Sequence, residues 1–330
     1  MSRAAAHDWK LADLEEAAAI VRQTLAPTPA IAWPLLAARC GTELVVKHEN
    51  HLPTGAFKLR GGLVYVRELV RREPGVRTLV AATRGNHGQS VAYAARAAGL
   101  AARLVVPHGN SPGKNAAMRA WGATLIEHGH DFSAALEHAR TLAAAPGLHL
   151  VPSFDWTLVR GVASCALELF RQTGPLDLLY VPIGLGSGIC GAIAARDALG
   201  LRTQIVGVVA DGAPAYALSF ARGEPVATDA AETLADGIAV RVPDPDALRE
   251  IRRGVERVFS VSEAEIRAAI RHYFTDTHNV AEGAAAAALA GLLRERESAR
   301  GRRVGLVLTG GNIDAEPFVE ALRPEPPPGR

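Results

Sequence analysis

The stretch PTGAFKLRGG, residues Pro53–Gly62, places two cations where a helix is expected to begin. The residues after it are spaced as on one face of a helix: Leu59, Leu63, Val66, Leu69 and Val70. Because helix N-termini favour anions, a lysine at position 58 is unusual. The helix dipole and the neighbouring Arg60 disfavour the charged form of Lys58 and so lower its pKa. A lysine that is often neutral is a nucleophile for carbonyl groups, although this stretch alone also allows an ordinary exposed lysine.

The composition predicts a globular protein of about two domains. The chain has 330 residues, of which 48% are hydrophobic, and its formal net charge is only +2. With that charge and only short arginine pairs, nucleic acid is not an expected partner. Three widely spaced cysteines indicate neither a disulfide framework nor a zinc site and favour the cytoplasm. The first ten residues hold no apolar run, so no signal peptide is expected.

Apolar runs rich in β-formers alternate with helix-like segments along the chain, which is the pattern of an α/β fold with a mostly parallel sheet. The runs predicted as buried strands are residues 44–47, 78–81, 103–106, 124–126, 178–183, 204–209 and 304–308. The uncharged run 178–195 approaches the length of a membrane span, but Pro182 and four glycines interrupt it, which favours a strand, loop and helix instead. The proline-rich end, residues 323–330, is expected to be extended or disordered.

The segment TRGNHGQS, residues 83–90, follows a predicted strand and precedes a predicted helix. Such a turn presents backbone N–H groups and the helix dipole to an anion, for example a carboxylate. The candidate substrate-binding residues here are Thr83, Arg84, Gly85, Asn86 and His87. A purely structural alternative stays open, in which Asn86 or Ser90 caps the helix and His87 packs.

Alternating glycines follow the strand 178–183 in the segment GLGSG, which comprises Gly184, Leu185, Gly186, Ser187 and Gly188. Glycines let the backbone wrap closely around a phosphate at a helix N-terminus. The pattern is equally typical of a dinucleotide site or of close helix packing. For a dinucleotide site, the acidic residue after the next strand would be Asp211, which lies slightly too far along the chain.

The segment TGGN, residues 309–312, ends the predicted strand 304–308. Ligands of open α/β sheets bind at the carboxyl ends of strands, so Thr309 and the two glycines could meet a flat ligand. Taken alone, the two glycines are better explained by a simple turn.

Taken in order, these segments resemble the fold-type II pyridoxal-phosphate (PLP) enzymes, within them the serine/threonine dehydratase and serine racemase group, which phenylserine dehydratases also resemble. The similarity covers nearly the whole chain and includes four further motifs: KHEN at 47–50, VPSFD at 151–155, TLADGIAV at 233–240 and AEGA at 281–284. It implies an α/β fold like that of the tryptophan synthase β subunit, with two open, mostly parallel sheets flanked by helices. It also implies a large cofactor-binding domain of residues 1–67 and 152–330, a small domain of residues 68–151, and a homodimer.

The resemblance assigns roles to individual residues. Lys58 matches the lysine that forms a Schiff base with PLP and removes the α-proton of the substrate. The other cofactor contacts that it implies are Phe57 and Gly237 on the two faces of the pyridine ring, Gly184–Gly188 at the phosphate, Asn86 at the phenolic oxygen and Thr309 at the pyridine nitrogen.

Two departures from the family pattern limit what the resemblance implies. Arg84 stands where the family commonly has serine, and a guanidinium stays protonated at neutral pH, so racemisation is not expected. Arg84 is instead expected to act in catalysis by contacting the substrate carboxylate, the phosphate or the β-substituent, and in the last case it would favour a larger or aromatic substrate. At the family's metal site, Asp211 could supply one carboxylate but residues 212–217 supply no second, so no metal is expected.

The resemblance therefore implies a PLP-dependent ammonia-lyase, or dehydratase. It would convert an amino-acid substrate such as threonine, serine or phenylserine to a 2-oxo acid and ammonia, with no nucleic-acid or membrane partner. Two alternatives stay open. One is a nicotinamide-dependent oxidoreductase that uses the loop Gly184–Gly188, and the other is a catalytically silent metabolite-binding protein of the same fold.

Overall fold

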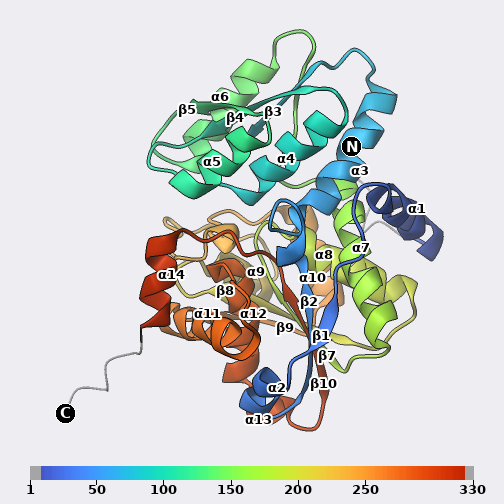
Figure 1. Cartoon of the computed structure of the whole chain (residues 1–330), viewed down its shortest axis with the longest axis vertical. Helices are drawn as coiled ribbons and strands as arrows, with labels where there is room; N and C mark the ends of the chain where they lie inside the picture. The colour runs from blue at the N-terminus through green and yellow to red at the C-terminus, as the bar shows by residue number, and fades with distance from the viewer. Residues whose placement is uncertain (1–8, 324–330) are drawn as a thin grey trace.

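The structure, a computed structural model, describes residues 9–323 and contains two sheets (Figure 1). The proline-rich segment 324–330 lies outside the described residues. The larger sheet has six strands in the order β1 (Ala30–Ala32), β2 (Glu43–His48), β10 (Arg303–Leu308), β7 (Leu178–Pro182), β8 (Gln204–Ala210) and β9 (Arg257–Val261). Its strand pairs are parallel except for β1 with β2.

The smaller sheet has four parallel strands in the order β5 (Thr124–Glu127), β4 (Ala101–Val106), β3 (Thr78–Ala82) and β6 (Leu148–Leu150). The two sheets confirm the predicted fold class, and every run that was predicted as a strand forms one. The sequence analysis missed β1, β6 and β9, and each of these lies at the edge of its sheet. Edge strands have one neighbour and fewer buried positions, so their apolar pattern is weak.

Helices cover the faces of both sheets. In chain order they are α1 (Leu11–Arg22), α2 (Pro34–Cys40), α3 (Lys58–Arg72), α4 (Asn86–Ala97), α5 (Pro112–Ala120), α6 (Phe132–Ala143), α7 (Trp156–Thr173), α8 (Ser187–Ala198), α9 (Ala215–Arg222), α10 (Pro245–Gly254), α11 (Glu263–Thr277), α12 (Gly283–Arg294), α13 (Arg296–Ala299) and α14 (Ala315–Leu322). There are two 3₁₀ helices in residues 9–323: η1 (Glu49–His51) follows β2, and η2 (Asp236–Ile238) precedes α10. Within residues 9–323, none of the helices combines the length and the apolarity needed to cross a bilayer.

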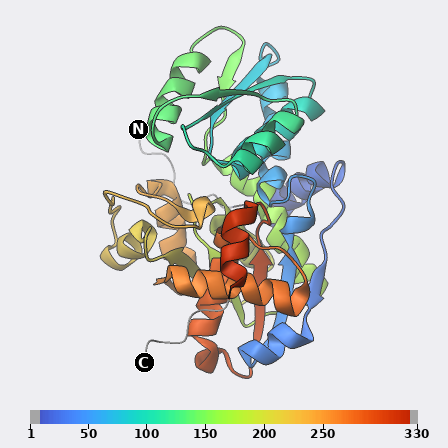
Figure 2. The same ribbon diagram turned by 60° about the vertical axis from the view of Figure 1, so that its left-hand side comes forward.

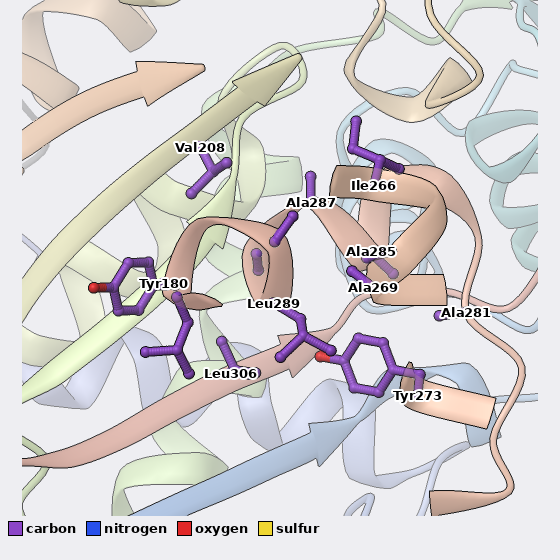
Figure 3. Packing of buried hydrophobic residues seen from close by; sticks show 14 of the residues in the cluster. Tyr180, Val208, Ile266, Ala269, Tyr273, Ala281, Ala285, Ala287, Leu289 and Leu306 are labelled. Atoms are coloured by element: carbon purple, nitrogen blue, oxygen red, sulfur yellow. The ribbon is translucent and has the colours of Figure 1, made fainter. Parts of the chain in front are cut away.

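Helix α12 forms the centre of the largest core, on one face of the six-stranded sheet. Its consecutive alanines are buried, and their small side chains let the helix lie close to the sheet and to α11. Figure 3 shows Leu289 of α12 between Tyr273 of α11 and Leu306 of β10, with Ala285 of the same helix beside Ala269 of α11. The opposite face of the same sheet is covered by α1, α7, α8 and α10, whose apolar residues form a second core.

The two sheets lie at opposite ends of the molecule, as Figures 1 and 2 show from two directions. All strands of the smaller sheet come from residues 78–150, and α4 and α5 lie on the side of that sheet that faces the larger one. The proposed domain boundaries, residues 68–151 against residues 1–67 and 152–330, stay a prediction. Hydrogen bonds join the two parts, among them those of Asn86 with Glu282 and with Asn312.

Candidate active site

Lys58 is the first residue of α3. Its Nζ donates to Ser187 Oγ at 3.0 Å and lies 5.0 Å from the centre of the Phe57 ring. Burial lowers the pKa of Lys58 to about 8, and the nearby carboxylate of Glu282 only partly opposes this. The predicted lowering is therefore present, but its main cause is burial and not the charge of the adjacent arginine.

Lys58 differs from Lys47 and Lys114 in its partner, and from Lys10 in being buried. The chain has four lysines, namely Lys10, Lys47, Lys58 and Lys114. Lys47 pairs with Glu168 and Lys114 with Asp236. Among residues 9–323, Lys58 has no carboxylate within ion-pair distance and donates to a neutral hydroxyl. Lys58 is thus the lysine that the fold prepares as a nucleophile.

The second cation of the opening stretch has a structural role. Arg60 is fully buried, and its guanidinium donates to Glu49 at 2.6 Å and to Glu168 at 2.7 Å. Lys47 Nζ donates to the same Glu168 at 2.8 Å, so Lys47, Glu49, Arg60 and Glu168 form a network that we call the buried quartet. The sequence analysis assigned it no role, although charged residues directly after the apolar run 44–46 were the available signal. The quartet ties the start of α3 to β2, η1 and α7.

The segment Gly184–Gly188, called the glycine loop below, joins β7 to α8 in a conformation that requires glycine. Gly186 has a φ of +107°, which is rare for other residues. A Cβ on Gly184 would lie 2.4 Å from the carbonyl oxygen of Gly237, and one on Gly186 would lie 2.6 Å from Ala247. The loop leads into the N-terminus of α8, whose first residue contacts Lys58. Free backbone N–H groups at such a terminus suit a phosphate.

The remaining predicted cofactor residues surround the same space. A Cβ on Gly188 would be 3.6 Å from the Phe57 ring, so this ring borders the glycine loop. Gly237 meets the loop through its carbonyl group at Gly184. Thr309 is buried at the end of β10, and its carbonyl oxygen accepts from Phe57 N at 2.9 Å. The structure therefore brings these residues together, while their individual contacts to a cofactor stay a prediction.

Asn86 is held by two residues to which the sequence analysis assigned no role. Its Nδ2 donates to Glu282 Oε1 at 2.7 Å, and its Oδ1 accepts from Asn312 Nδ2 at 2.8 Å. Burial raises the pKa of Glu282, although Lys114 and the amide of Asn86 oppose this change. The motifs AEGA and TGGN contain both partners, but only the folded chain shows that they meet Asn86.

The segment Thr83–His87, called the substrate turn below, is fixed by its first residue. Thr83 Oγ1 accepts from the backbone N–H of Gly85 at 3.0 Å and of Gly88 at 2.9 Å. Burial lowers the pKa of His87 to about 4, so its ring is neutral at neutral pH. His87 Nε2 is enclosed and has no hydrogen-bond partner in the part of the chain that the structure describes. It is therefore free to meet a bound molecule.

Arg84 extends from the substrate turn toward η2. Its Nη2 lies 3.1 Å from Oδ1 of Asp236, which is the residue before Gly237. The structure thus places Arg84 beside the predicted site, and its contact to substrate stays a prediction. For the metal site, no cluster of three or more His, Cys, Asp or Glu side chains within residues 9–323 could hold an ion.

The fold and these residues define an enzyme of the pyridoxal-phosphate class. Residues 21–310 match the family described as "Pyridoxal-phosphate dependent enzyme", and the chain belongs to this family. It is 33% identical to an L-threo-3-hydroxyaspartate ammonia-lyase of Pseudomonas sp., over 90% of this chain and 93% of that protein. It is 32% identical to an L-threonine ammonia-lyase of Thermotoga maritima, over 92% and 76%. The crystal structure of a threonine deaminase from T.th. superposes with a TM-score of 0.86 at 32% identity, over 93% and 99%.

These similarities confirm the predicted family, its cofactor and the ammonia-lyase class of reaction. They give no support to the nicotinamide-dependent alternative. The residues present also fit PLP, because a glycine loop at a helix N-terminus, a lysine of lowered pKa and an unpartnered histidine nitrogen share one site. The amino acid on which the chain acts depends on the side chains that line its own site.

The pKa of Lys58 predicts how covalent attachment of PLP to the apoenzyme depends on pH. Only the neutral amine attacks the aldehyde, so the attachment rate should rise about tenfold per pH unit below pH 8 and level off above it. A lysine with the ordinary pKa of 10.5 would keep accelerating beyond pH 9. Stopped-flow absorbance of PLP mixed with apoenzyme measures this rate, and a profile still rising at pH 10 would contradict the assignment.

Replacing Gly184 with alanine tests the glycine loop. The new Cβ would meet the carbonyl oxygen of Gly237 at 2.4 Å, and both are backbone groups that cannot move aside cheaply. We expect the dissociation constant for PLP to rise about tenfold or more, since overpacking costs about 1–3 kcal/mol. Equilibrium dialysis measures the change. Gly75→Ala is the control, because no atom lies within 4 Å of a Cβ there and its affinity should equal that of the wild type.

Proposed function

We propose that the protein is a PLP-dependent ammonia-lyase that dehydrates and deaminates a β-hydroxy-α-amino acid to a 2-oxo acid and ammonia. The observation that carries this proposal is the placement of Lys58, whose pKa is lowered to about 8, between the glycine loop and the substrate turn. Relatives that are named for the same reaction on threonine and on threo-3-hydroxyaspartate support it.

When bound, PLP supplies an electron sink that stabilises negative charge at the α-carbon of the substrate. The glycine loop would hold its phosphate, and Phe57 and Gly237 would flank its ring. Asn86, held by Glu282 and Asn312, would bind the phenolic oxygen. The hydroxyl of Thr309 at the ring nitrogen does not enforce protonation as a carboxylate would, which favours prompt loss of the β-substituent.

Lys58 is the base of the reaction. Its neutral amine takes the α-proton, so the α C–H bond breaks while the substrate turn holds the substrate carboxylate. The β C–O bond then breaks, and the hydroxyl leaves as water with the proton that Lys58 took, which returns the amine to its neutral form. The released enamine becomes an imine, which water hydrolyses to the 2-oxo acid and ammonia. The ring of His87 is neutral and hydrogen-bonded to the backbone of Val151, so its enclosed Nε2 is an acceptor and would meet a donor group of the substrate, not its carboxylate.

A substrate panel tests the proposal. The purified protein with PLP is assayed for 2-oxo acid and ammonia from L-serine, L-threonine, L-threo-3-hydroxyaspartate and phenylserine. Formation of both products in equal amounts from at least one substrate supports the function. PLP binding with no product from any of the four would favour the catalytically silent alternative instead.

The proposal extends to assembly and location. The family resemblance supports a homodimer, and light scattering of the purified protein would measure it. A reducing compartment such as the cytoplasm agrees with Cys40, Cys165 and Cys190, which are buried and free.

A further inference from the structure

Asp236 is held by two cations from the smaller-sheet part of the chain. Arg84 Nη2 lies 3.1 Å from its Oδ1, and Lys114 Nζ lies 3.1 Å from its Oδ2. Each carboxylate oxygen therefore has its own cation, one a guanidinium and one an ammonium. Two such donors on the two oxygens are the partners that a protein offers a bound carboxylate. We call Arg84 and Lys114 the cation pair.

The cation pair joins the substrate turn to η2, the segment that packs against the glycine loop. The chain of Lys114 crosses the turn so closely that a Cβ on Gly85 would lie 2.5 Å from its Cδ. Asp236 precedes Gly237, whose carbonyl group packs against Gly184. Lys114 and Asp236 also act electrostatically on the buried carboxylate of Glu282, as does Lys58. A substrate on the turn would therefore extend its side chain near these charges.

The charges in this place do not cancel. Two cations pair with one carboxylate, so Arg84, Lys114 and Asp236 together carry a net charge of +1, and burial raises the pKa of the neighbouring Glu282, which disfavours its charged form. The side chains of Arg84 and Asp236 keep 46% and 27% of their surface exposed. An entering anion can therefore reach the cation pair, and the displaced carboxylate of Asp236 can rotate toward solvent. The Arg84–Asp236 pair is partly exposed, and such a pair is worth about 1 kcal/mol or less, so exchange of its carboxylate for that of a ligand costs little. Lys114 is more buried, with 11% of its side chain exposed, and would exchange one carboxylate for another without losing its ion pair.

We propose that Arg84 and Lys114 bind a second carboxylate of the substrate, so that the enzyme prefers dicarboxylic β-hydroxy-α-amino acids such as threo-3-hydroxyaspartate. Asp236 occupies this subsite until the substrate displaces it. The inference rests on the proposed function and names its substrate class. An aromatic β-substituent, which the sequence also suggested, offers no carboxylate, so it would cover the net charge of +1 on Arg84, Lys114 and Asp236 without compensating it, and burying such a charge is costly.

The test compares L-threo-3-hydroxyaspartate with L-threonine in the wild type and in Arg84→Met, Lys114→Met and Asp236→Asn. Each methionine variant should lower the ratio of kcat/KM for hydroxyaspartate over threonine about tenfold or more, because a charge-assisted hydrogen bond is lost. Asp236→Asn removes the competing carboxylate and should keep or raise that ratio. Arg119→Met changes a different cation of α5, the helix that carries Lys114; Arg119 is paired at the surface with Glu127, and its loss should leave the ratio unchanged.

The alternative is that Arg84, Lys114 and Asp236 have a purely structural role, in which their ion pairs only hold the two parts of the chain together. We call this alternative the latch. A latch predicts that all three variants lower kcat/KM for both substrates by the same factor, and that result would overturn the inference. Calorimetric titration of the PLP-loaded protein with succinate and butyrate gives a readout without turnover. The wild type should bind succinate more tightly, the methionine variants should lose this preference, and a wild type without preference refutes the subsite. If no amino acid is turned over but succinate is preferred, the proposed reaction fails while the subsite stands.

Discussion

Lys58→Ala is expected to lower kcat for ammonia release by at least about 10³-fold, because one side chain serves as the attachment point of the cofactor and as the base. The variant should also lose the visible absorbance that lysine-bound PLP gives. Lys58 Nζ is 3.0 Å from Ser187 at the start of α8, and another amine cannot take its place, because Lys47 and Lys114 are held by carboxylates. Absorbance spectra and an ammonia assay on the same preparation measure both effects.

The small number of lysines makes a direct chemical check possible. Borohydride reduction of the PLP-loaded protein, followed by peptide mapping, should place the label on Lys58 and on none of the other three lysines. Lys10→Ala, at the exposed start of α1, is the matched control and should retain absorbance and activity. A label on Lys47 or Lys114, or undiminished ammonia release by Lys58→Ala, would refute the assignment.

The parts of the fold that the sequence predicts are those whose apolar pattern is strong. Strands β2, β7, β8 and β10 lie inside the larger sheet, are buried over most of their length and appear as continuous apolar runs. Strands β1 and β6 have three residues each and lie at sheet edges, where no such run is required. The short length of β1 and β6, together with their edge position, explains why they were missed, since the longer edge strand β5 was predicted.

Some residues of the candidate site can likewise be predicted from the local sequence, and others cannot. The glycine loop and Lys58 are local features, because a strand, a turn and a helix start within a few residues determine them. Glu282 is 196 residues from its partner Asn86, and Asp236 is 122 residues from Lys114. No local sequence pattern predicts such pairings, since either carboxylate could equally well lie on the protein surface. Only the folded structure, in which the two parts of the chain meet, shows that Glu282 and Asp236 belong to the site.

The buried quartet is the clearest case of a role that local reasoning could not assign. Burial alone would raise the pKa of Glu49, but the charge and hydrogen bonds of Arg60 outweigh it and lower that pKa overall. The stabilisation from this carboxylate is therefore present above its ordinary pKa of 4.5 and is lost as the pH falls below that value. Because Arg60 is two residues from Lys58, the quartet holds the turn that carries the nucleophile.

Arg60→Met should lower the free energy of unfolding by about 3–5 kcal/mol, because it leaves Glu49 and Glu168 buried with one cation between them. The same substitution at the far end of α3, Arg72→Met, breaks an exposed pair with Glu73 and should cost less than about 1 kcal/mol. Urea unfolding of the apoenzymes at pH 7 compares the two without any contribution from PLP. The gap between Arg60→Met and the wild type should narrow below pH 4.5, as Glu49 is protonated and the quartet loses its charge balance. Equal losses for the two variants would mean that the quartet adds no more stability than a surface ion pair, and that packing alone holds the start of α3 in place.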